Sequence, residues 1–213
     1  MEILPVIVAL DDMDRERAIS IARALSGRVW GFKVHELVDV YGPEIIGTLK
    51  IYGRVFVDMK VSDTPKTTRN RVRAYVAHGA DFISVHAERG ENTLRAAVKV
   101  GRDRIVAITT LTSEADASRV TELARTAYKA GIKNIVCSAH EAGVVRAVAP
   151  NATIISPGIR EKGAPQHDQV RTMSAPKALL AGADLLVIGR PITDLKDPTA
   201  ALEGLFNEKE DPV

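Results

Sequence analysis

The chain alternates eight times between a short apolar run and a helical pattern, and this alternation constrains its fold more than any other feature. Each run is apolar throughout and rich in β-branched residues, as expected of a strand that is buried on both faces. Such strands, each followed by a helix, form parallel sheets with the helices packed outside. The predicted strands are Leu4–Asp11, Val29–His35, the run that begins at Val55, Asp81–Ala87, Ile105–Leu111, Asn134–Ser138, Thr153–Gly158 and Asp184–Arg190.

The segments between the strands carry the spacing of amphipathic helices. One helix start is marked clearly, because Thr64 suits a cap and Pro65 suits the first helical position. The predicted helices are Asp12–Ser26, Gly42 to about Ile51, Pro65 to about His78, Asn92–Val100, about Ala115 to Ala130, a segment that ends at Val148, Asp168–Ala181 and Pro198–Phe206.

Eight strand–helix units predict a closed (β/α)₈ barrel, the TIM barrel, and residues 1–213 are expected to form this single domain. The alternative is an open, doubly wound sheet. It fits less well, because the strands recur evenly and no Gly-x-Gly-x-x-Gly follows the first strand.

Composition narrows the range of partners. The formal net charge is +2 and aromatic residues make up 4% of the chain, so a nucleic-acid surface is not expected. No apolar run approaches the roughly 20 residues of a membrane span, and the start of the chain lacks the layout of a signal peptide. We therefore expect a cytoplasmic protein without nucleic-acid or membrane partners. The lone cysteine, Cys137, is expected to be a small buried hydrophobic residue.

Charged residues gather at the end of the third predicted strand. Asp58 and Lys60 are two residues apart, so both point to the same face of an extended strand, and Asp63 follows them. Opposite charges on a buried face are unfavourable unless they serve each other or a ligand. One interpretation is an ion pair that only holds the core together. The other is a functional site, since α/β folds build their sites at the carboxyl ends of strands.

Lys33, Asp58, Lys60 and Asp63 would form an alternating row of cations and anions without net charge. At an effective dielectric constant of ~20 and a separation of about 4 Å, each contact between neighbours is worth about 4 kcal/mol. Such a row keeps a lysine protonated and a carboxylate ionised inside a pocket. This chemistry suits proton delivery to carbon, or stabilisation of a carbanion.

A metal site is the alternative use of the same carboxylates. Asp58 and Asp63, with His35 or His86, could bind Mg²⁺ or Zn²⁺. The lysines between them compete with a cation, so this alternative is the weaker one.

The last two predicted strands are followed by glycine and arginine, in Pro157-Gly158-Ile159-Arg160 and in Gly189-Arg190. In a (β/α)₈ barrel, the loops after these two strands are the usual phosphate-binding position. Gly189 lets a backbone N–H approach an anion closely, and two guanidinium groups can clamp its oxygens. Solvated surface arginines are the alternative.

These motifs, in this order, resemble those of the orotidine 5′-phosphate decarboxylase family along the whole chain. The most specific is Asp58–Thr67 (DMKVSDTPKT), which is similar to the family signature Asp-x-Lys-x-x-Asp-Ile-Pro-Asn-Thr. The sequence departs from the family where Thr64 and Lys66 replace isoleucine and asparagine, and where His35 replaces a common glycine. Further matches are Leu10-Asp11, Phe32-Lys33-Val34, Leu111-Thr112-Ser113, Val136–Ala139, Pro157–Arg160, Asp168-Gln169 and Ile188–Ile192.

The resemblance implies decarboxylation of orotidine 5′-monophosphate (OMP) to UMP, the last step of de novo pyrimidine biosynthesis, without a cofactor or a metal. It implies that Lys60 protonates C6 of the pyrimidine and that Asp58 lies against the substrate carboxylate. It also implies that Lys33 orients the row and contacts the ribose, as Asp11 does.

The resemblance further implies how the rest of the substrate is bound. Thr112 would hydrogen-bond the pyrimidine, and Asp63 and Thr67 would enter the site of a neighbouring subunit in a homodimer. The phosphate end would be formed by Pro157, Arg160, Gln169, Gly189 and Arg190.

Two alternatives remain for the activity. The first is a related enzyme that resembles Mg²⁺-dependent enzymes acting on sugar phosphates, either hexulose-phosphate synthase or ketogulonate-phosphate decarboxylase. These enzymes share the barrel and the Asp-x-Lys-x-x-Asp motif, but Thr64–Thr67 favours the enzyme that acts on a nucleotide. A catalytically silent nucleotide-binding barrel is the other, and the presence of all four charged residues argues against it.

Overall fold

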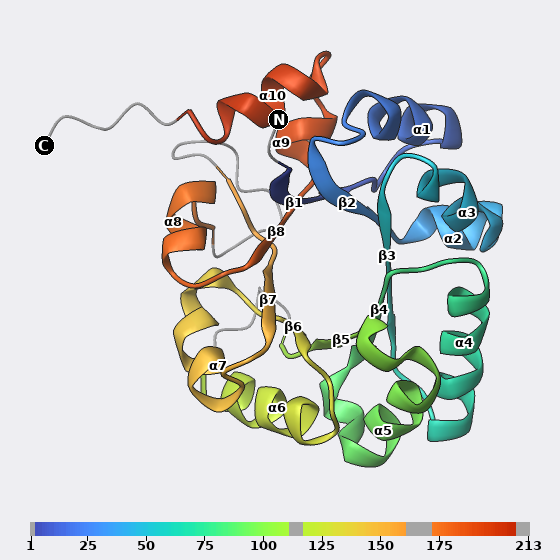
Figure 1. Ribbon diagram of the computed structural model, residues 1–213, viewed down its shortest axis with the longest axis vertical. Helices are drawn as coiled ribbons and strands as arrows, with labels where there is room; N and C mark the ends of the chain where they lie inside the picture. Colours follow the sequence, from blue (N-terminus) through green and yellow to red (C-terminus); the bar gives the residue numbers. More distant parts are fainter. Residues whose placement is uncertain (1–2, 111–116, 161–171, 208–213) are drawn as a thin grey trace, which may run out of the picture.

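The computed structural model describes residues 3–110, 117–160 and 172–207 of the 213-residue chain. Within them, eight parallel strands close into a barrel in the order of the sequence, with the last strand paired to the first (Figure 1). The predicted (β/α)₈ fold class is therefore confirmed. The strands are β1 (Leu4–Ala9), β2 (Val29–Val34), β3 (Arg54–Val61), β4 (Phe82–His86), β5 (Ile105–Ile108), β6 (Asn134–Val136), β7 (Thr153–Ser156) and β8 (Leu185–Ile188).

Helices form an outer ring around the barrel in Figure 1 and connect each strand to the next, with two more after β8. None of the helices in the described parts of the chain has the length and apolar character needed to cross a membrane. The helices are α1 (Arg15–Ala24), α2 (Glu36–Tyr41), α3 (Glu44–Lys50), α4 (Pro65–Ala77), α5 (Gly90–Gly101), α6 (Ala117–Lys129), α7 (Ala142–Val148), α8 (Ala175–Leu180), α9 (Arg190–Thr193) and α10 (Pro198–Gly204).

The connection between β2 and β3 differs from the single helix predicted from Gly42 to Ile51. It contains two helices, α2 and α3, which are separated at Gly42 and Pro43. Gly42 has a left-handed φ of 73°, which a helix cannot continue through, and Pro43 offers no N–H to extend α2. α2 escapes prediction because its six residues are too few for a helical period to be recognised.

The helix predicted from Asp168 to Ala181 begins later in the described residues. α8 starts at Ala175, and Met173 before it is extended and paired in parallel with Ile159. The N–H of Arg160 donates to the Met173 carbonyl at 3.0 Å. No local pattern indicates this bridge, which connects the loop after β7 to the segment that leads into α8.

A Gly-Ala-Asp sequence precedes both β4 and β8 and forms the same structure each time. Its glycine ends the preceding helix with a left-handed φ, of 91° after α4 and 106° after α8. Its carboxylate then accepts a backbone N–H of the neighbouring strand: Asp81 from Val55 at 2.8 Å, and Asp184 from Ile154 at 2.7 Å. Each carboxylate also pairs with a cation, on α3 and on α7 respectively. These contacts fasten the strands at their amino-terminal ends, away from the carboxyl ends where a site is expected.

Aromatic and aliphatic side chains fill the interior of the barrel. Trp30 and Phe82 stack with ring centroids 4.6 Å apart, and Phe56 meets Phe82 edge-on at 6.0 Å. These rings pack with a layer of buried aliphatic residues from the other strands, which include Ile7 and Ile155. The barrel is therefore a packed core and not a channel.

Cys137 is buried, as predicted, in a core that lies between the barrel and α6 and α7. Burial, and secondly the charge of Glu141, raise the pKa of the Cys137 thiol to about 12. The thiol therefore stays neutral at physiological pH and packs as an apolar residue.

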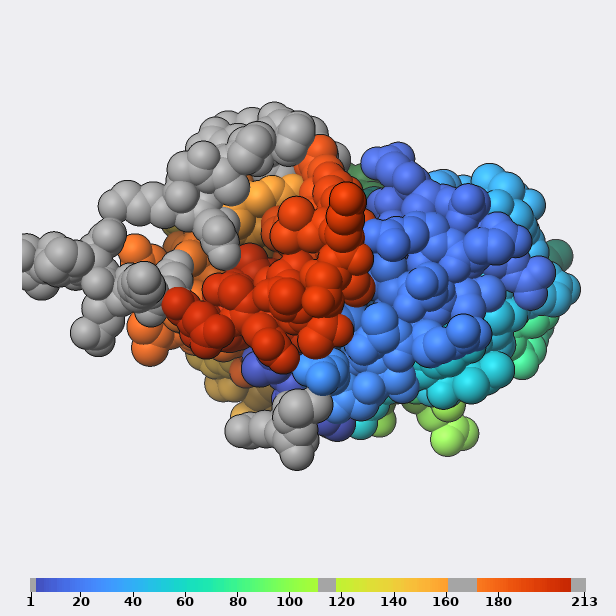
Figure 2. All heavy atoms as spheres, turned by 90° about the horizontal axis from the view of Figure 1, so that it is seen from above, coloured from blue at the N-terminus to red at the C-terminus, as the bar shows by residue number. Residues whose placement is uncertain are grey.

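The first and last elements of the chain lie side by side and complete the ring. Figure 2 shows the red segment that contains α9 and α10 against the blue segment that contains α1. Arg28, just before β2, pairs with Glu203 of α10 at 3.0 Å. Arg17 of α1 donates to the carbonyl oxygens of Thr193 and Leu195, each at 3.1 Å.

Candidate active site

A cavity of about 920 Å³ lies among the carboxyl ends of the strands. Its walls come from β1, β2, β3, β5, β6 and β8 and from the residues that follow β1, β7 and β8. Barrels of this class carry their sites at this end. The predicted site residues that line it are Asp11, Lys33, Asp58, Lys60, Pro157, Arg160, Gly189 and Arg190.

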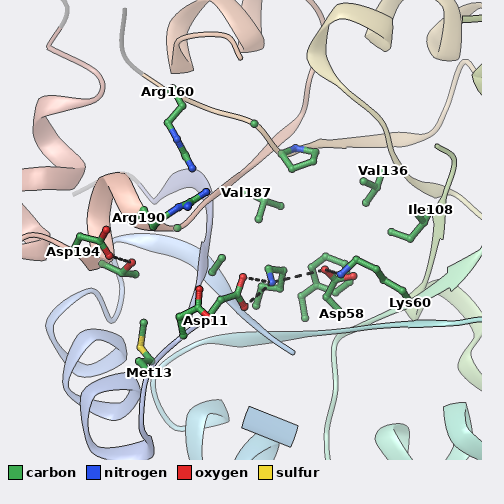
Figure 3. A pocket seen from close by; sticks show the side chains of 18 of the residues that line it. Asp11, Met13, Asp58, Lys60, Ile108, Val136, Arg160, Val187, Arg190 and Asp194 are labelled. Atoms are coloured by element: carbon green, nitrogen blue, oxygen red, sulfur yellow. Dashed lines mark hydrogen bonds and ion pairs between the residues drawn. The ribbon is translucent and has the colours of Figure 1, made fainter. Parts of the chain in front are cut away.

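Four charged side chains form an alternating row along one side of the cavity, linked by dashed lines in Figure 3. Nζ of Lys33 lies 2.7 Å from Oδ2 of Asp11 and 3.8 Å from Oδ2 of Asp58. The same Asp58 oxygen lies 3.0 Å from Nζ of Lys60. The row therefore reads anion, cation, anion, cation from Asp11 to Lys60, and its formal charges cancel.

Asp63 and Thr67 do not belong to this row in the single chain, where Asp11 completes it instead. Oδ1 of Asp63 accepts the N–H of Thr64 at 2.6 Å, and the Thr67 hydroxyl accepts from that of Thr64 at 3.2 Å. Both residues lie at the start of α4, and neither lines the cavity. Their predicted action in a neighbouring subunit's site stays a prediction.

The centre of the row is almost withdrawn from solvent. Lys33 and Asp58 are each 7% exposed, whereas the Lys60 side chain is 35% exposed. Attraction between charges is stronger at buried positions than at the surface, but it must also offset their lost hydration. Oδ1 of Asp58 is buried without a hydrogen-bond partner among the described residues. The negative charge on this oxygen is therefore not offset by a hydrogen bond from the described residues. Such an oxygen beside a cavity is more typical of a functional group than of a structural ion pair.

β3 carries a bulge where the sequence predicts a regular strand. Asp58, Met59 and Lys60 of β3 lie opposite a single residue of β4, Ser84. Lys60 has a left-handed φ of 44°, which is unfavourable for a residue that has a side chain. Asp58 and Lys60 nevertheless both line the cavity, so they share a face as expected although Lys60 has a left-handed φ.

Two arginines lie at one end of the cavity and Lys60 at the other (Figure 3). Arg160 is 8% exposed, and its guanidinium donates to the neighbouring backbone carbonyl at 2.8 Å. Arg190 begins α9 directly after Gly189, where an added Cβ would lie 3.4 Å from that of Ala9. That distance is an ordinary van der Waals contact, so packing of the loop after β8 on β1 does not by itself require a glycine. Two guanidinium groups at one position suit an anion with several oxygens, such as a phosphate.

Arg17 also lines the cavity, although no motif in the sequence predicts it there. Its hydrogen bonds to the carbonyls of Thr193 and Leu195 connect α1 to the end of α9, directly beyond the Gly189–Arg190 loop. In the sequence, an arginine on an amphipathic helix resembles a solvated surface residue. Only the contact between the first and last parts of the chain assigns it to the cavity.

Apolar residues that also went unpredicted line the cavity above the charged row in Figure 3. Ile108, Val136 and Val187 lie near the carboxyl ends of β5, β6 and β8, and all three line the cavity. Their positions at strand ends were a usable signal, because inward-facing residues alternate along a strand. An apolar wall between charged ends suits a flat, uncharged portion of a ligand.

The alternative metal site does not form among the described residues. Nδ1 of His35 lies 2.7 Å from the backbone carbonyl of Asp58, and Nδ1 of His86 lies 3.9 Å from a carboxylate oxygen of Glu88. Across the described ranges, no group of three His, Cys, Asp or Glu side chains is arranged to hold a metal ion.

Thr112 and Gln169 lie outside the described residues. The pyrimidine contact predicted for Thr112 and the phosphate contact predicted for Gln169 therefore stay predictions.

The sequence is similar to proteins of one family over nearly its whole length. The family model described as "Orotidine 5'-phosphate decarboxylase / HUMPS family" matches residues 4–205. A protein of Thermobifida fusca (strain YX) is 41% identical over 221 residues, which cover 96% of this chain and 95% of that protein. A protein of Shewanella sediminis (strain HAW-EB3) is 35% identical over 231 residues, which cover 98% of each. Both carry the name orotidine 5′-phosphate decarboxylase.

The fold also has a counterpart among solved structures. An uncharacterized conserved protein from Geobacillus kaustophilus superimposes with a TM-score of 0.79 at 28% sequence identity. The match covers 95% of this chain and 98% of that chain. The barrel is thus shared over its full extent.

Proposed function

This chain is an enzyme of the orotidine 5′-phosphate decarboxylase / HUMPS family, and we propose that its cavity converts OMP to UMP, without a cofactor or a metal, as one domain of residues 1–213. The observation that carries the proposal is the alternating Asp11–Lys33–Asp58–Lys60 row, with Lys60 at its open end. A second candidate within the same family acts on sugar phosphates, but the relatives at 35–41% identity are named for the nucleotide reaction.

Lys60 is the proposed proton donor. When the bond between C6 and the carboxylate carbon breaks, CO₂ leaves and the electron pair stays at C6, in an in-plane orbital that the ring π-system cannot delocalise. A fixed ammonium beside that carbon stabilises the developing charge and then transfers its proton to form the C–H bond. Support comes from the 3.0 Å contact of Lys60 with Asp58, which holds a protonated amine at the cavity wall.

Asp58 is proposed to lie against the substrate carboxylate. Its Oδ2 is engaged by both lysines, whereas its buried Oδ1 has no partner among the described residues. A negative charge on this oxygen disfavours a second carboxylate beside it. This repulsion is relieved as the carboxylate departs as neutral CO₂, while the Lys60 ammonium offsets the negative charge left at C6. Asp11 and Lys33, joined at 2.7 Å, are proposed to bind the ribose.

The opposite end of the cavity is proposed to bind the phosphate through Arg160, Gly189 and Arg190, with Gln169 and Pro157 beside them. Two guanidinium groups and a glycine backbone suit a dianion. The apolar wall of Ile108, Val136 and Val187 suits the uncharged faces of the pyrimidine between the two ends, and Thr112 is proposed to hydrogen-bond that ring. The phosphate lies away from C6, so its binding energy can lower the barrier to the chemical step and not only tighten substrate binding.

The function is tested by turnover in the presence of a chelator. We expect the purified chain to consume OMP, followed by its absorbance, at the same rate with and without EDTA. The reason is that the proposed chemistry uses only Lys60 and the row around it. The result that would overturn the proposal is a chain inert toward OMP that becomes active on a sugar phosphate once Mg²⁺ is added.

A homodimer is proposed as the working unit, with Asp63 and Thr67 of one subunit reaching the site of the other. In the single chain both residues lie outside the cavity, at the start of α4, although they belong to the same signature as Asp58 and Lys60. A residue that the family motif assigns to catalysis, but that does not line its own cavity, fits a contribution across an interface.

Mixing two inactive variants tests the shared site. Lys60→Ala and Asp63→Ala are each expected to lose most activity, and a dimer containing one of each keeps one intact site. Random re-association should therefore restore about a quarter of wild-type activity. A mixture of Lys60→Ala with Asp58→Ala is the control, because both side chains come from the same chain and no intact site results. No recovery beyond this control would refute the shared site.

A further inference from the structure

The bulge of β3 interrupts the ladder of hydrogen bonds at the residues that carry the proposed chemistry. β3 has two more residues than β4 between their neighbouring pairs, Val57 with Ile83 and Val61 with Val85. Backbone groups of bulged residues lose their regular partners, and buried polar groups need replacements. Side chains of two adjacent strands supply these replacements.

Ser84 braces the bulge from β4. It is fully buried, and its hydroxyl accepts the N–H of Lys60 at 2.7 Å. Lys60 is the residue with the left-handed φ, so this hydrogen bond holds the least favourable backbone conformation of the strand. Removing this acceptor would remove the hydrogen bond that fixes the orientation of the Lys60 N–H.

His35 braces the bulge from β2. Regular pairing of β2 with β3 ends at Val34 and Val57, and His35 follows directly. Its Nδ1 lies 2.7 Å from the carbonyl oxygen of Asp58. A carbonyl oxygen only accepts, so Nδ1 carries the hydrogen and donates it. The backbone of Asp58 is thus fixed from one side and that of Lys60 from the other.

We propose that His35 and Ser84 are positioning residues for the decarboxylation: they hold the β3 bulge so that the Lys60 ammonium and the Asp58 carboxylate stay in register with C6. This inference rests on the proposed function, because it assigns a role within that reaction. Neither side chain is among the residues that line the cavity, so each acts through the backbone of a catalytic residue. A displacement of about 1 Å at a reacting group can lower a rate by ~10²-fold.

The test separates positioning from binding. In His35→Ala and in Ser84→Ala we expect kcat to fall roughly 10- to 100-fold, with KM changed by less than about threefold. His35→Asn should recover most of the lost kcat, because its amide can donate from nearly the same point as Nδ1. The double variant should lose less than the product of the single losses, since both residues hold one bulge.

Matched controls come from the same residue types elsewhere. Ser156 is as buried as Ser84, but its hydroxyl has no hydrogen-bond partner among the described residues, so Ser156→Ala should leave kcat unchanged. His78, at the end of α4, makes the same kind of contact, with Nδ1 2.8 Å from the Ala74 carbonyl oxygen, but it contacts neither the β3 bulge nor the cavity in the described structure. The inference would be overturned if kcat fell as much in Ser156→Ala and His78→Ala as in Ser84→Ala and His35→Ala. It would also be overturned if Ser84→Ala and His35→Ala kept kcat within about twofold of wild type.

A readout independent of turnover distinguishes failure of this inference from failure of the proposed function. Hydrogen exchange of the Lys60 amide, measured by NMR, should accelerate at least about tenfold in Ser84→Ala, while exchange at Val57 stays the same. An unchanged Lys60 exchange rate would overturn the bracing role. If wild type does not consume OMP, the proposed function fails, and exchange alone then decides whether Ser84 holds the bulge.

Discussion

Lys60→Ala should lower kcat for OMP by roughly 10⁴-fold or more. In the proposed mechanism, the substitution removes both the cation that stabilises charge at C6 and the acid that protonates it. It also leaves the nearly buried Asp58 with Lys33 as its only described ion-pair partner, at 3.8 Å. Steady-state kinetics with OMP, followed by absorbance, measure the loss.

Two companion measurements make this result specific. Binding of UMP should be retained in Lys60→Ala, because the arginines proposed to bind the phosphate lie at the other end of the cavity. Lys99→Ala, on the exposed surface of α5, removes a lysine outside the cavity and should keep full activity. If kcat of Lys60→Ala stayed within tenfold of wild type, another group would have to donate the proton.

Replacing both arginines, in Arg160→Ala/Arg190→Ala, should lower kcat/KM for OMP by roughly 10²- to 10⁴-fold. Each charge-assisted hydrogen bond contributes about 1.5–3 kcal/mol, and the pair is expected to hold the same phosphate. Turnover of orotidine, the same nucleoside without its phosphate, should be almost unchanged in this variant. Comparing the two substrates therefore isolates the phosphate interaction from any general damage to the site.

The control for the arginine variant is Arg125→Ala, which removes an exposed guanidinium of α6 outside the cavity. Its kinetics with OMP should match wild type. Equal losses with OMP and with orotidine in the double variant would contradict the phosphate role, and would instead indicate that Arg160 or Arg190 supports the fold of the loops.

The parts of the fold that depend on local patterning were predictable. Eight apolar runs and the helical spacing between them indicate the closed barrel, since strands buried on both faces are apolar throughout. Knowing where each strand ends also predicts Asp11, Lys33, Arg160 and Arg190 at one end of the barrel, because parallel strands present their carboxyl ends together.

The features that escaped prediction depend on contacts between distant segments. The β3 bulge is defined by the pairing with β4, and His35 and Ser84 contact its backbone; none of these partners is visible within Asp58–Lys60 itself. The place of Asp11 in the row depends on the side-by-side packing of β1 and β2. The reach of Arg17 into the cavity likewise needs the last elements of the chain to lie beside the first.

The pairing of β8 with β1 has a consequence for how the chain folds during its translation. Asp11 comes from the beginning of the chain and Arg190 from near its end, yet both line one cavity. Most strand–helix units contact their sequence neighbours and can form early, but the closing pair joins distant segments and is entropically the slowest to find. A ribosome-bound chain that lacks β8 therefore has all four residues of the charged row, but it lacks Gly189 and Arg190, so its cavity is incomplete. If the proposed function holds, affinity for the substrate arises at barrel closure, and nucleotide present at that moment should favour the closed chain over its partly folded forms.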